Sequence, residues 1–202
     1  MGISALKFIF YSRWLPRRLQ YRFVASLPSD GKVLDIGAGS GKYGRLFKDY
    51  TPTDVEARNP ASVIADANVA LPFPSGSFDL VMAIEVLEHL HTPTVAVREA
   101  FRVLKQGGTF AATVPFVWKL HEEPHDFHRY TKYAVEKYLK DVGFIEIAIE
   151  PECGYVYTLM ALTAAKWRFL APLTNTTGYL ASLFEKDFSL PLGNRVRAKK
   201  PK

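Results

Sequence analysis

A glycine-rich segment directly after a short apolar run restricts the folds open to this chain more than any other part of it. Residues 33–41 read Val-Leu-Asp-Ile-Gly-Ala-Gly-Ser-Gly. The apolar residues predict a buried strand over 32–36, and the residues after the turn predict a helix over 41–50. Glycines allow the backbone to approach a ligand closely, and the start of a helix offers unpaired N–H groups. In a parallel sheet such a turn lies at the carboxyl edge of the strands, where ligands bind.

Several interpretations of this turn are open. A P-loop is excluded, because it requires glycine where the chain has Ile36 and Ser or Thr where it has Tyr43. Residues 39–44 can be aligned with a dinucleotide fingerprint, but the carboxylate of Asp35 would repel a pyrophosphate. The same carboxylate suits a ligand that carries an ammonium and a sulfonium group. A turn with a purely structural role is the remaining alternative.

Short apolar runs alternate with helical stretches along the middle of the chain. This alternation predicts an α/β fold, a Rossmann-like, doubly wound and mostly parallel sheet with helices on both faces. At 202 residues, the chain is expected to form a single domain. Further strands are expected over 51–54, 63–65, 78–84, 109–115, 144–149 and 193–198, and helices over 94–104 and 132–142.

The two ends of the chain differ from this core, which we expect to span 29–152. Residues 1–28 predict a basic amphipathic helix, or two helices that are interrupted at Pro16. Residues 153–202 predict an apolar helical insertion that is followed by the final strand. The apolar part of this insertion is expected either to lie on a lipid surface, or to cover the active site or form a homodimer contact.

Charge is unevenly distributed between these parts. Residues 1–25 carry five Lys and Arg and no Asp or Glu, and residues 153–202 carry eight and two. Residues 26–152 carry 13 basic and 18 acidic side chains. The basic ends predict an anionic neighbour such as a membrane surface, contacted peripherally through 1–25 and 153–184. The acidic middle argues against a nucleic-acid partner, which would require a basic face.

The chain has one cysteine, which fits a reducing compartment, and its start does not have the pattern of a secretory signal. No run of about 20 uncharged apolar residues is present, so a conventional transmembrane helix is not expected. These observations predict a cytoplasmic protein, with membrane association as a second expectation.

Residues 35–41 resemble the first motif of the class I methyltransferases, which use S-adenosylmethionine (SAM). Later motifs follow in order: Asp54 ends the second strand, Asp66-Ala67 precedes residues 71–79, and residues 84–90 read Ile-Glu-Val-Leu-Glu-His-Leu. Together these motifs resemble the methyltransferase type 11 group over residues 30–150. The resemblance implies SAM as the cofactor and methyl transfer, an activity of class EC 2.1.1, as the reaction.

The resemblance also implies which residues contact the cofactor. They are Asp35, Gly37, Ala38, Gly39, Gly41, Asp54, Asp66, Ala67, Glu85 and His89. In the family the acid at the end of the second strand holds the ribose hydroxyls, and a carboxylate at the next strand end has a natural spacing for this. Glu56 could take that role instead, or Asp54 could be a turn residue. Asp66 could receive the adenine amino group or only cap a turn.

All five histidines of the chain fall between residues 89 and 128. Residues 121–131 follow the fifth predicted strand and resemble a segment found in a subset of the type 11 group. Because this segment is expected to face the cofactor, His125 and His128 are the candidates for a general base. Thr131 is expected to cap the next helix, and Arg129 to pair with a carboxylate.

A metal site is conceivable from the three histidines of this segment and their acidic neighbours, but we expect no metal ion there. Its histidines do not have the spacing of a zinc pair carried on one helix, and methyl transfer needs no metal.

Motifs that the chain lacks narrow the acceptor. Residues 85–87 read Glu-Val-Leu, where enzymes that methylate adenine or glutamine amides carry Asn/Asp-Pro-Pro-aromatic. No Pro-Cys pair is present for transfer to pyrimidine C5. We therefore expect a small-molecule, lipid or sugar-linked acceptor that is methylated on oxygen or carbon. The alternative is a SAM-binding regulatory or scaffold protein without turnover.

Overall fold

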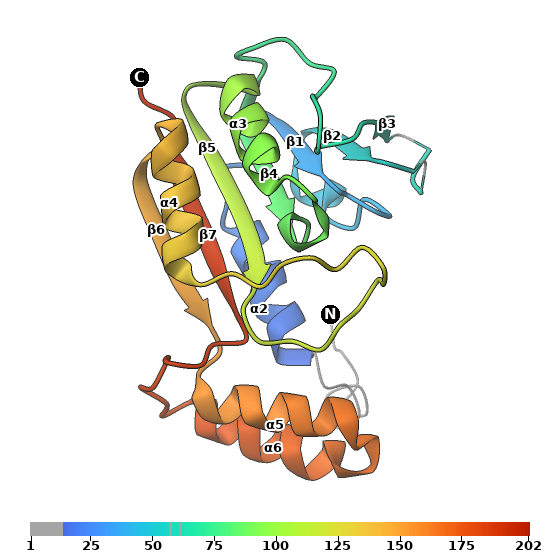
Figure 1. Cartoon of the computed structure of the whole chain (residues 1–202), viewed down its shortest axis with the longest axis vertical. Coiled ribbons are helices and arrows are strands. Elements are labelled where there is room, and N and C mark those ends of the chain that lie inside the picture. Colours follow the sequence, from blue (N-terminus) through green and yellow to red (C-terminus); the bar gives the residue numbers. More distant parts are fainter. Residues whose placement is uncertain (1–13, 57, 61) are drawn as a thin grey trace.

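A computed structural model describes residues 14–56, 58–60 and 62–202 of the chain. Seven strands form one sheet in the order β3-β2-β1-β4-β5-β7-β6. All neighbours pair in parallel except β7, which runs antiparallel to β5 and β6 (Figure 1). The strands are β1 (Lys32–Ile36), β2 (Asp49–Asp54), β3 (Val63–Ile64), β4 (Phe78–Ile84), β5 (Leu104–Pro115), β6 (Ile145–Glu152) and β7 (Gly193–Lys199). The predicted mostly parallel α/β sheet is confirmed.

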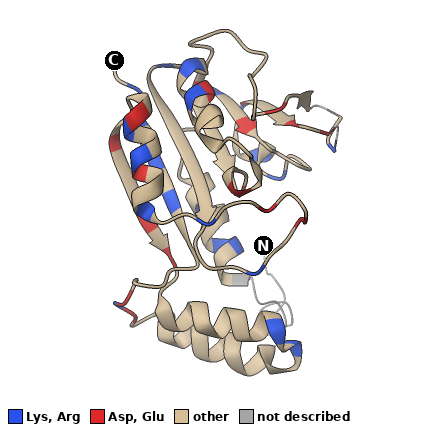
Figure 2. Ribbon diagram, viewed as in Figure 1, with Lys and Arg blue, Asp and Glu red and all other residues tan. Residues whose placement is uncertain are grey.

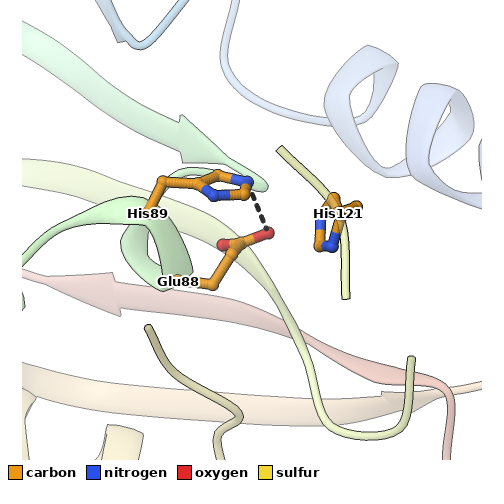
Figure 3. A group of neighbouring side chains, drawn as sticks. All are labelled: Glu88, His89 and His121. Atoms are coloured by element: carbon orange, nitrogen blue, oxygen red, sulfur yellow. Dashed lines mark ion pairs between the residues drawn. The ribbon is translucent and has the colours of Figure 1, made fainter. Parts of the chain in front are cut away.

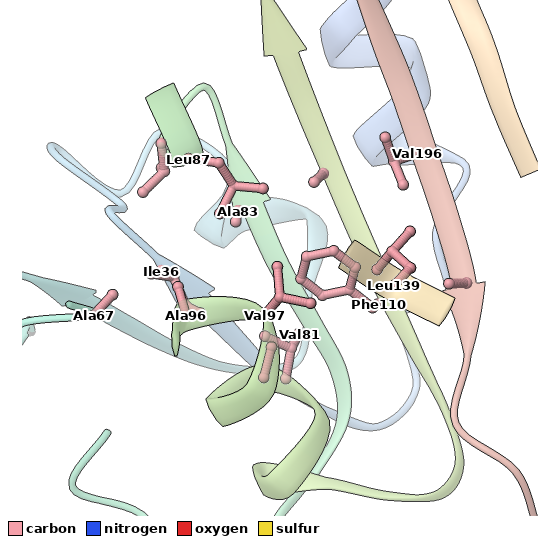
Figure 4. Close-up of a cluster of buried hydrophobic side chains, with 14 of the residues drawn as sticks. Ile36, Ala67, Val81, Ala83, Leu87, Ala96, Val97, Phe110, Leu139 and Val196 are labelled. Atoms are coloured by element: carbon pink, nitrogen blue, oxygen red, sulfur yellow. The ribbon is translucent and has the colours of Figure 1, made fainter. Parts of the chain in front are cut away.

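Helices cover both faces of the sheet because side chains alternate along each buried strand. On one face, helices α3 (Pro93–Val103) and α4 (Lys132–Val142) pack on the sheet in the larger hydrophobic cluster. Figure 4 shows Val81 and Phe110 of the strands in this cluster together with Val97 of α3. On the other face lie α2 (Trp14–Ala25) and the short 3₁₀ helix η1 (Gly44–Leu46).

Local capping residues explain why α4 begins and ends as predicted. The side chain of Thr131 accepts a hydrogen bond from the backbone N–H of Ala134, at 3.2 Å. Gly143 ends the helix in the left-handed conformation with φ of 104°, which is a common C-terminal stop. The predicted helix over 132–142 and the predicted cap at Thr131 are therefore confirmed.

The helix predicted over 41–50 is wrong. Turns and η1 occupy this stretch, and β2 already begins at Asp49. Gly41 has a φ of 69°, outside the helical region, and glycine in a helix costs about 1 kcal/mol relative to alanine. With Gly41 and Gly44 in so short a connection, a regular helix has too few favourable residues to form. The N–H groups beside the glycine turn therefore belong to consecutive turns and not to a helix start.

The described part of helix α2 runs from Trp14 to Ala25 and includes Pro16, so the chain is helical on the C-terminal side of this proline. The part of the predicted N-terminal helix that precedes residue 14 lies outside the described residues.

The apolar segment after β6 forms a helical hairpin, as predicted. It consists of α5 (Tyr155–Lys166), the 3₁₀ helix η3 (Arg168–Leu170) and α6 (Ala171–Ser182). Figure 1 shows the two long helices as a layer beyond the end of the sheet. A small cluster of Leu15, Cys153, Tyr157, Ala161 and Leu192 joins the hairpin to α2 and to the chain before β7. Among the described residues, no helix is long and apolar enough to cross a membrane.

Candidate functional site

The glycine turn after β1 depends on backbone conformations that favour glycine. Gly37 and Gly39 have φ values of 64° and 55°. A Cβ atom at Gly37 would lie 2.6 Å from Cγ2 of Val86, so packing alone requires glycine there. A Cβ atom at Gly39 would meet no atom within 4 Å. Gly39 therefore leaves its backbone open on the side where a ligand would approach.

Asp35 supplies a buried carboxylate at the end of β1. Its side chain is almost completely buried, and the Tyr50 hydroxyl donates a hydrogen bond to its Oδ2 at 2.5 Å. Burial raises the pKa of Asp35 to about 7, although the Tyr50 hydrogen bond and the charge of Lys42 both lower it in part. A carboxylate with this little hydration gains a large stabilisation from a cationic ligand group.

Asp54 lies at the end of β2, next to the glycine turn. The backbone N–H of Gly39 donates to its Oδ2 at 2.9 Å, and the N–H of Glu56 donates to its Oδ1 at 3.3 Å. Glu56 itself is exposed and pairs with Arg58 at 3.1 Å. The carboxylate of Asp54 is therefore held in place by two backbone donors, whereas that of Glu56 is directed to a surface ion pair.

Asp66 forms a local turn, one of the two roles expected for it. Its Oδ1 accepts hydrogen bonds from the backbone N–H and the side-chain amide of Asn68, at 2.8 and 2.9 Å. Glu85, directly after β4, has a φ of 57°, a left-handed conformation that is uncommon for a side chain of this kind. Strained residues of this type are frequent at ligand sites.

A cavity of about 930 Å³ brings these residues together at the carboxyl edge of the parallel strands. Every cofactor residue predicted from the sequence lines it except Gly41. A Cβ atom at Gly41 would instead lie 2.3 Å from Nδ2 of Asn59, so this glycine serves the packing of the turn. The fold thus places nine of the ten predicted cofactor residues in the wall of one cavity. Their contacts with the cofactor remain predictions.

The loop after β5 closes the other side of the cavity, fastened to the 3₁₀ helix η2 (Leu87–His89). The backbone N–H groups of Phe127 and His128 donate to the carbonyl oxygen of Glu88 at 2.9 and 3.2 Å. The hydroxyl of Tyr130 donates to the carbonyl oxygen of Leu87 at 2.8 Å. Because of these bonds, the loop and η2 form one unit.

An ion pair between Asp126 and Arg129 determines the shape of this loop. The guanidinium donates to Oδ1 at 2.6 Å and to Oδ2 at 2.8 Å, and it also reaches the carbonyl oxygens of Trp118 and Lys119. These hydrogen bonds hold the pKa of Asp126 well below its usual range. The expected pairing of Arg129 with a carboxylate is confirmed.

The two histidines predicted as general bases occupy different positions. His125 is exposed and lines the cavity. His128 is not among the described residues that line it, and its ring lies beside Tyr130 with the centroids 5.6 Å apart. Both assignments remain predictions, and the geometry favours His125 for contact with an acceptor.

Glu88 is a site residue that was not predicted from the sequence. Its position in an apolar run next to His89 could have indicated a buried acidic side chain. The side chain is completely buried, and neither carboxylate oxygen has a hydrogen-bond partner within the described part of the chain. Burial, together with the charge of Glu85, raises the pKa of Glu88. His121 also lines the cavity, and its ring packs edge-on against that of His89 with the centroids 5.0 Å apart.

Comparison with known proteins agrees with this geometry. Residues 34–112 match the type 11 family that is described as a methyltransferase domain. The chain contains a class I, SAM-dependent methyltransferase domain. The predicted family and its cofactor, SAM, are confirmed. The methyltransferase in a Haloferax volcanii complex with the Trm112 activator has the same fold, with a TM-score of 0.67 at 17% identity over 95% of this chain and 94% of its own.

Relatives of this methyltransferase domain differ in their acceptors. The tRNA (carboxymethyluridine(34)-5-O)-methyltransferase alkbh8 of Xenopus tropicalis is 32% identical over 132 residues, which are 59% of this chain and 19% of the relative. The 2-methyl-6-phytyl-1,4-hydroquinone methyltransferase of Synechocystis is 34% identical over 110 residues, which are 44% of this chain and 33% of the relative. The chain spans less than half the length of either curated relative. Membership of the family therefore leaves the acceptor of this chain open.

Proposed function

We propose that this chain is an enzyme that transfers the methyl group of SAM to an oxygen or carbon atom of a lipid-like acceptor at a membrane surface. The observation that carries the proposal is an exposed apolar hairpin that adjoins the cavity. Trp118 and Leu192 line the cavity, and both also pack in the cluster that anchors the hairpin. An acceptor held on the hairpin would lie next to the cavity mouth.

The residues of the cavity suit SAM. Asp35 offers a buried carboxylate for the ammonium group, Asp54 offers carboxylate oxygens for the ribose hydroxyls, and the open backbone at Gly39 allows close approach. SAM supplies a methyl carbon that is already activated by a sulfonium group. The protein then has to align the acceptor and accept its proton, a task for which His125 at the cavity wall is placed.

The surface of the hairpin supports a lipid partner. Phe169, Leu173 and Leu180 are 77%, 67% and 54% exposed, and they belong to η3 and to one face of α6. Large apolar side chains exposed together on one element often mark an interaction site. Residues 155–184 contain no acidic side chain, and their only charges are Lys166 and Arg168 (Figure 2). Basic residues beside Trp167 are typical of elements that lie in the headgroup region of an anionic membrane.

A nucleic-acid acceptor is the second candidate, because one relative is named as a tRNA methyltransferase. The charge of the cavity argues against it. Eight acidic side chains line the cavity and only three Lys or Arg, so its field would repel a phosphate backbone. The acidic residues are Asp35, Asp54, Glu56, Asp66, Glu85, Glu122, Glu123 and Glu152.

Two measurements test the proposal. The purified chain should co-sediment with phosphatidylglycerol-containing vesicles, and the double variant Phe169→Ser, Leu173→Ser should lose this binding about tenfold. Tyr133→Ser is the matched control, since Tyr133 is 69% exposed on α4, away from the hairpin. Methyl-labelled SAM should then transfer label into a lipid extract and not into tRNA.

Three outcomes would overturn the proposal. Label in the tRNA fraction would favour the RNA acceptor. A dimer that the Phe169→Ser, Leu173→Ser variant abolishes would assign the hairpin to a second copy of the chain. SAM binding without label transfer to either fraction would favour a SAM-binding protein without turnover.

A further inference from the structure

The side chain of Glu88 is a buried carboxylate without a hydrogen-bond partner among the described residues. Both of its oxygens lack a partner among the described residues, and its side chain is 0% exposed. A buried carboxylate without a hydrogen-bond partner is costly, so a native protein retains one only where protonation, a cation or another partner offsets that cost. The nearest polar atom that the contacts identify is Nε2 of His89, 3.8 Å from Oε1. Figure 3 shows the Glu88 carboxylate next to the ring of His89, with the ring of His121 beside both.

The hydrogen bonds of His89 determine which of its nitrogens carries the proton. Nδ1 lies 2.6 Å from the carbonyl oxygen of His125, and a carbonyl oxygen can only accept. Nδ1 must therefore donate, and in the neutral ring Nε2 keeps a free lone pair. That lone pair belongs to the nitrogen nearest Glu88.

The same reasoning applies to His121. Its Nδ1 lies 3.2 Å from Oδ2 of Asp126 and 3.3 Å from the carbonyl oxygen of Lys119, and both are acceptors. Nδ1 of His121 is therefore the protonated nitrogen, and Nε2 is free to bind another group. Histidines that bind metal ions almost always donate their other N–H to a carboxylate or a backbone carbonyl, as both of these do.

We infer that Glu88, His89 and His121 form a binding site for one divalent transition-metal ion such as Zn²⁺ or Mn²⁺. One ligand atom from each residue can be chosen so that all three lie within 4.8 Å of one another. Two imidazoles and one carboxylate suit ions of this class, which leave further positions for water or substrate. Bonds of about 2.0–2.2 Å require the three donors to move closer by small side-chain rotations. The carboxylate of Glu122, 4.0 Å from Nε2 of His89, lies within reach as a fourth ligand.

The three residues come together only through the fold. Glu88 and His89 follow β4, and His121 follows β5, the neighbouring strand. The loop that carries His121 is held against η2 by the backbone bonds to Glu88. A metal site was conceivable from the sequence only for the histidines within 121–128, whose spacing is not that of a zinc pair on one helix.

Metal binding itself does not depend on the proposed acceptor. His89 and His121 line the cavity together with His125, so an ion held by them would be reachable from the cavity. Only the further idea that the ion coordinates an acceptor oxygen rests on the proposed function. The experiment therefore measures the ion directly.

The test uses the full chain after treatment with a chelator. Calorimetric titration with Zn²⁺, and separately with Mn²⁺, should show one ion bound per chain for at least one of the two metals. His121→Ala and Glu88→Gln should each weaken that binding about 10–100-fold or more. His91→Ala is the matched control and should bind the ion as tightly as the parent chain, since His91 lines the same cavity but packs on Phe127.

SAM titration of the same variants shows whether they are folded, and His121→Ala changes a partly exposed side chain that the core does not need. Failure of both metals to bind the parent chain would overturn the inference. Equal metal affinity in the parent chain and His121→Ala would do so as well. Retained SAM binding in these cases would leave the proposed methyltransferase function unaffected.

Discussion

The backbone N–H of Gly39 donates a hydrogen bond to Oδ2 of Asp54 at 2.9 Å. Together with the bond from the backbone N–H of Ala38 to the carbonyl oxygen of Thr53, this contact joins the glycine turn after β1 to the end of β2, the two segments that the family uses for SAM. Asp54 is only 8% exposed, so the bond is shielded from competing water. The carboxylate that is predicted to hold the ribose hydroxyls also holds the turn.

Asp54→Ala should therefore weaken SAM binding about 10–100-fold, because it removes a charge-assisted hydrogen bond to the ligand and loosens the turn. Isothermal titration of the variant measures this directly. Asp66→Ala is the control, because the Oδ1 of Asp66 is already engaged by Asn68. It should have the smaller effect, and equal losses in the two variants would contradict the assignment of Asp54.

SAM affinity should rise between pH 6 and pH 8, by up to about tenfold. Burial raises the pKa of Asp35 to about 7, so at pH 6 the free protein holds this carboxyl mostly neutral. A ligand ammonium group binds the ionised form, which becomes dominant only above pH 7. Titrations at pH 6, 7 and 8 test this, and Asp35→Asn should bind weakly with no such rise. A flat profile in the parent chain would exclude Asp35 as the ammonium partner.

The same carboxyl should limit the stability of the ligand-free protein. The folded-state pKa of about 7 lies above the ordinary aspartate pKa of 3.8, so the folded state binds more protons between these pH values. The contribution of this carboxyl to the free energy of unfolding is fully present below about pH 3.8 and is lost as the pH rises through 7. Asp35→Asn should thus gain stability relative to the parent chain as the pH rises, on the order of 1–3 kcal/mol at pH 8. Thermal or urea unfolding at pH 5 and 8 measures the difference, and a gain that does not grow with pH would refute it.

Arg129→Lys should reduce methyl transfer about tenfold or more while SAM affinity changes little. Lysine cannot reproduce the two parallel bonds to Asp126 or the contacts to the Trp118 and Lys119 carbonyl oxygens, so the histidine-bearing loop should lose its shape. Arg102→Lys provides the control, because it removes a similar pair of guanidinium–carboxylate hydrogen bonds, from Arg102 to Glu99 on α3. That variant should lose stability without a comparable loss of turnover per folded molecule. Equal turnover in the two variants would show that the loop needs no such anchor.

The Asp126–Arg129 pair also predicts a response to acid. Because the pKa of Asp126 is lowered, its contribution to stability is present above the ordinary aspartate pKa and is lost as the pH falls through the folded-state value. The stability difference between the parent chain and Asp126→Asn should therefore be constant near neutrality and shrink in acid. Unfolding at pH 7 and at pH 3 measures it, and a difference that grows in acid would contradict the pairing.

His125→Ala should lower methyl transfer about 10²–10⁴-fold without changing SAM affinity, if proton removal limits the reaction. His128→Ala should have a smaller effect, because His128 is not among the described residues that line the cavity. Turnover and SAM titration of both variants test the assignment. A larger loss in His128→Ala would transfer the role to that residue.

Most elements of the sheet could be predicted because their signals are local. The strand over 78–84 and the helix over 132–142 are found within the predicted bounds. The helix over 41–50 could not be predicted correctly, because the apolar spacing after the turn resembles a helix while Gly41 and Gly44 oppose one. Periodicity reports which side chains face the core, and it does not report backbone conformation.

The candidate site was predictable in part. Asp35, Gly39 and Asp54 could be located because each lies at or just after the end of a strand, and the carboxyl ends of parallel strands meet at one edge of the sheet. The environment of Glu88 could not be foreseen, since the absence of a donor around a buried side chain is a property of the packed structure. The different exposure of His125 and His128 to the cavity likewise depends on how the loop folds back on η2.

The sequence by itself determined the fold class, the cofactor and the edge of the sheet at which the cofactor site lies. These features were predictable because their signals span only a few residues. The signals are the periodicity of the strands, the glycines of the turns and the acidic residues at the strand ends. The tertiary structure alone decided that Glu88, His89 and His121 meet, and that the apolar helical hairpin adjoins the cavity. Both depend on contacts between residues far apart in sequence, which form only when the sheet orders its strands and the loops close over its edge.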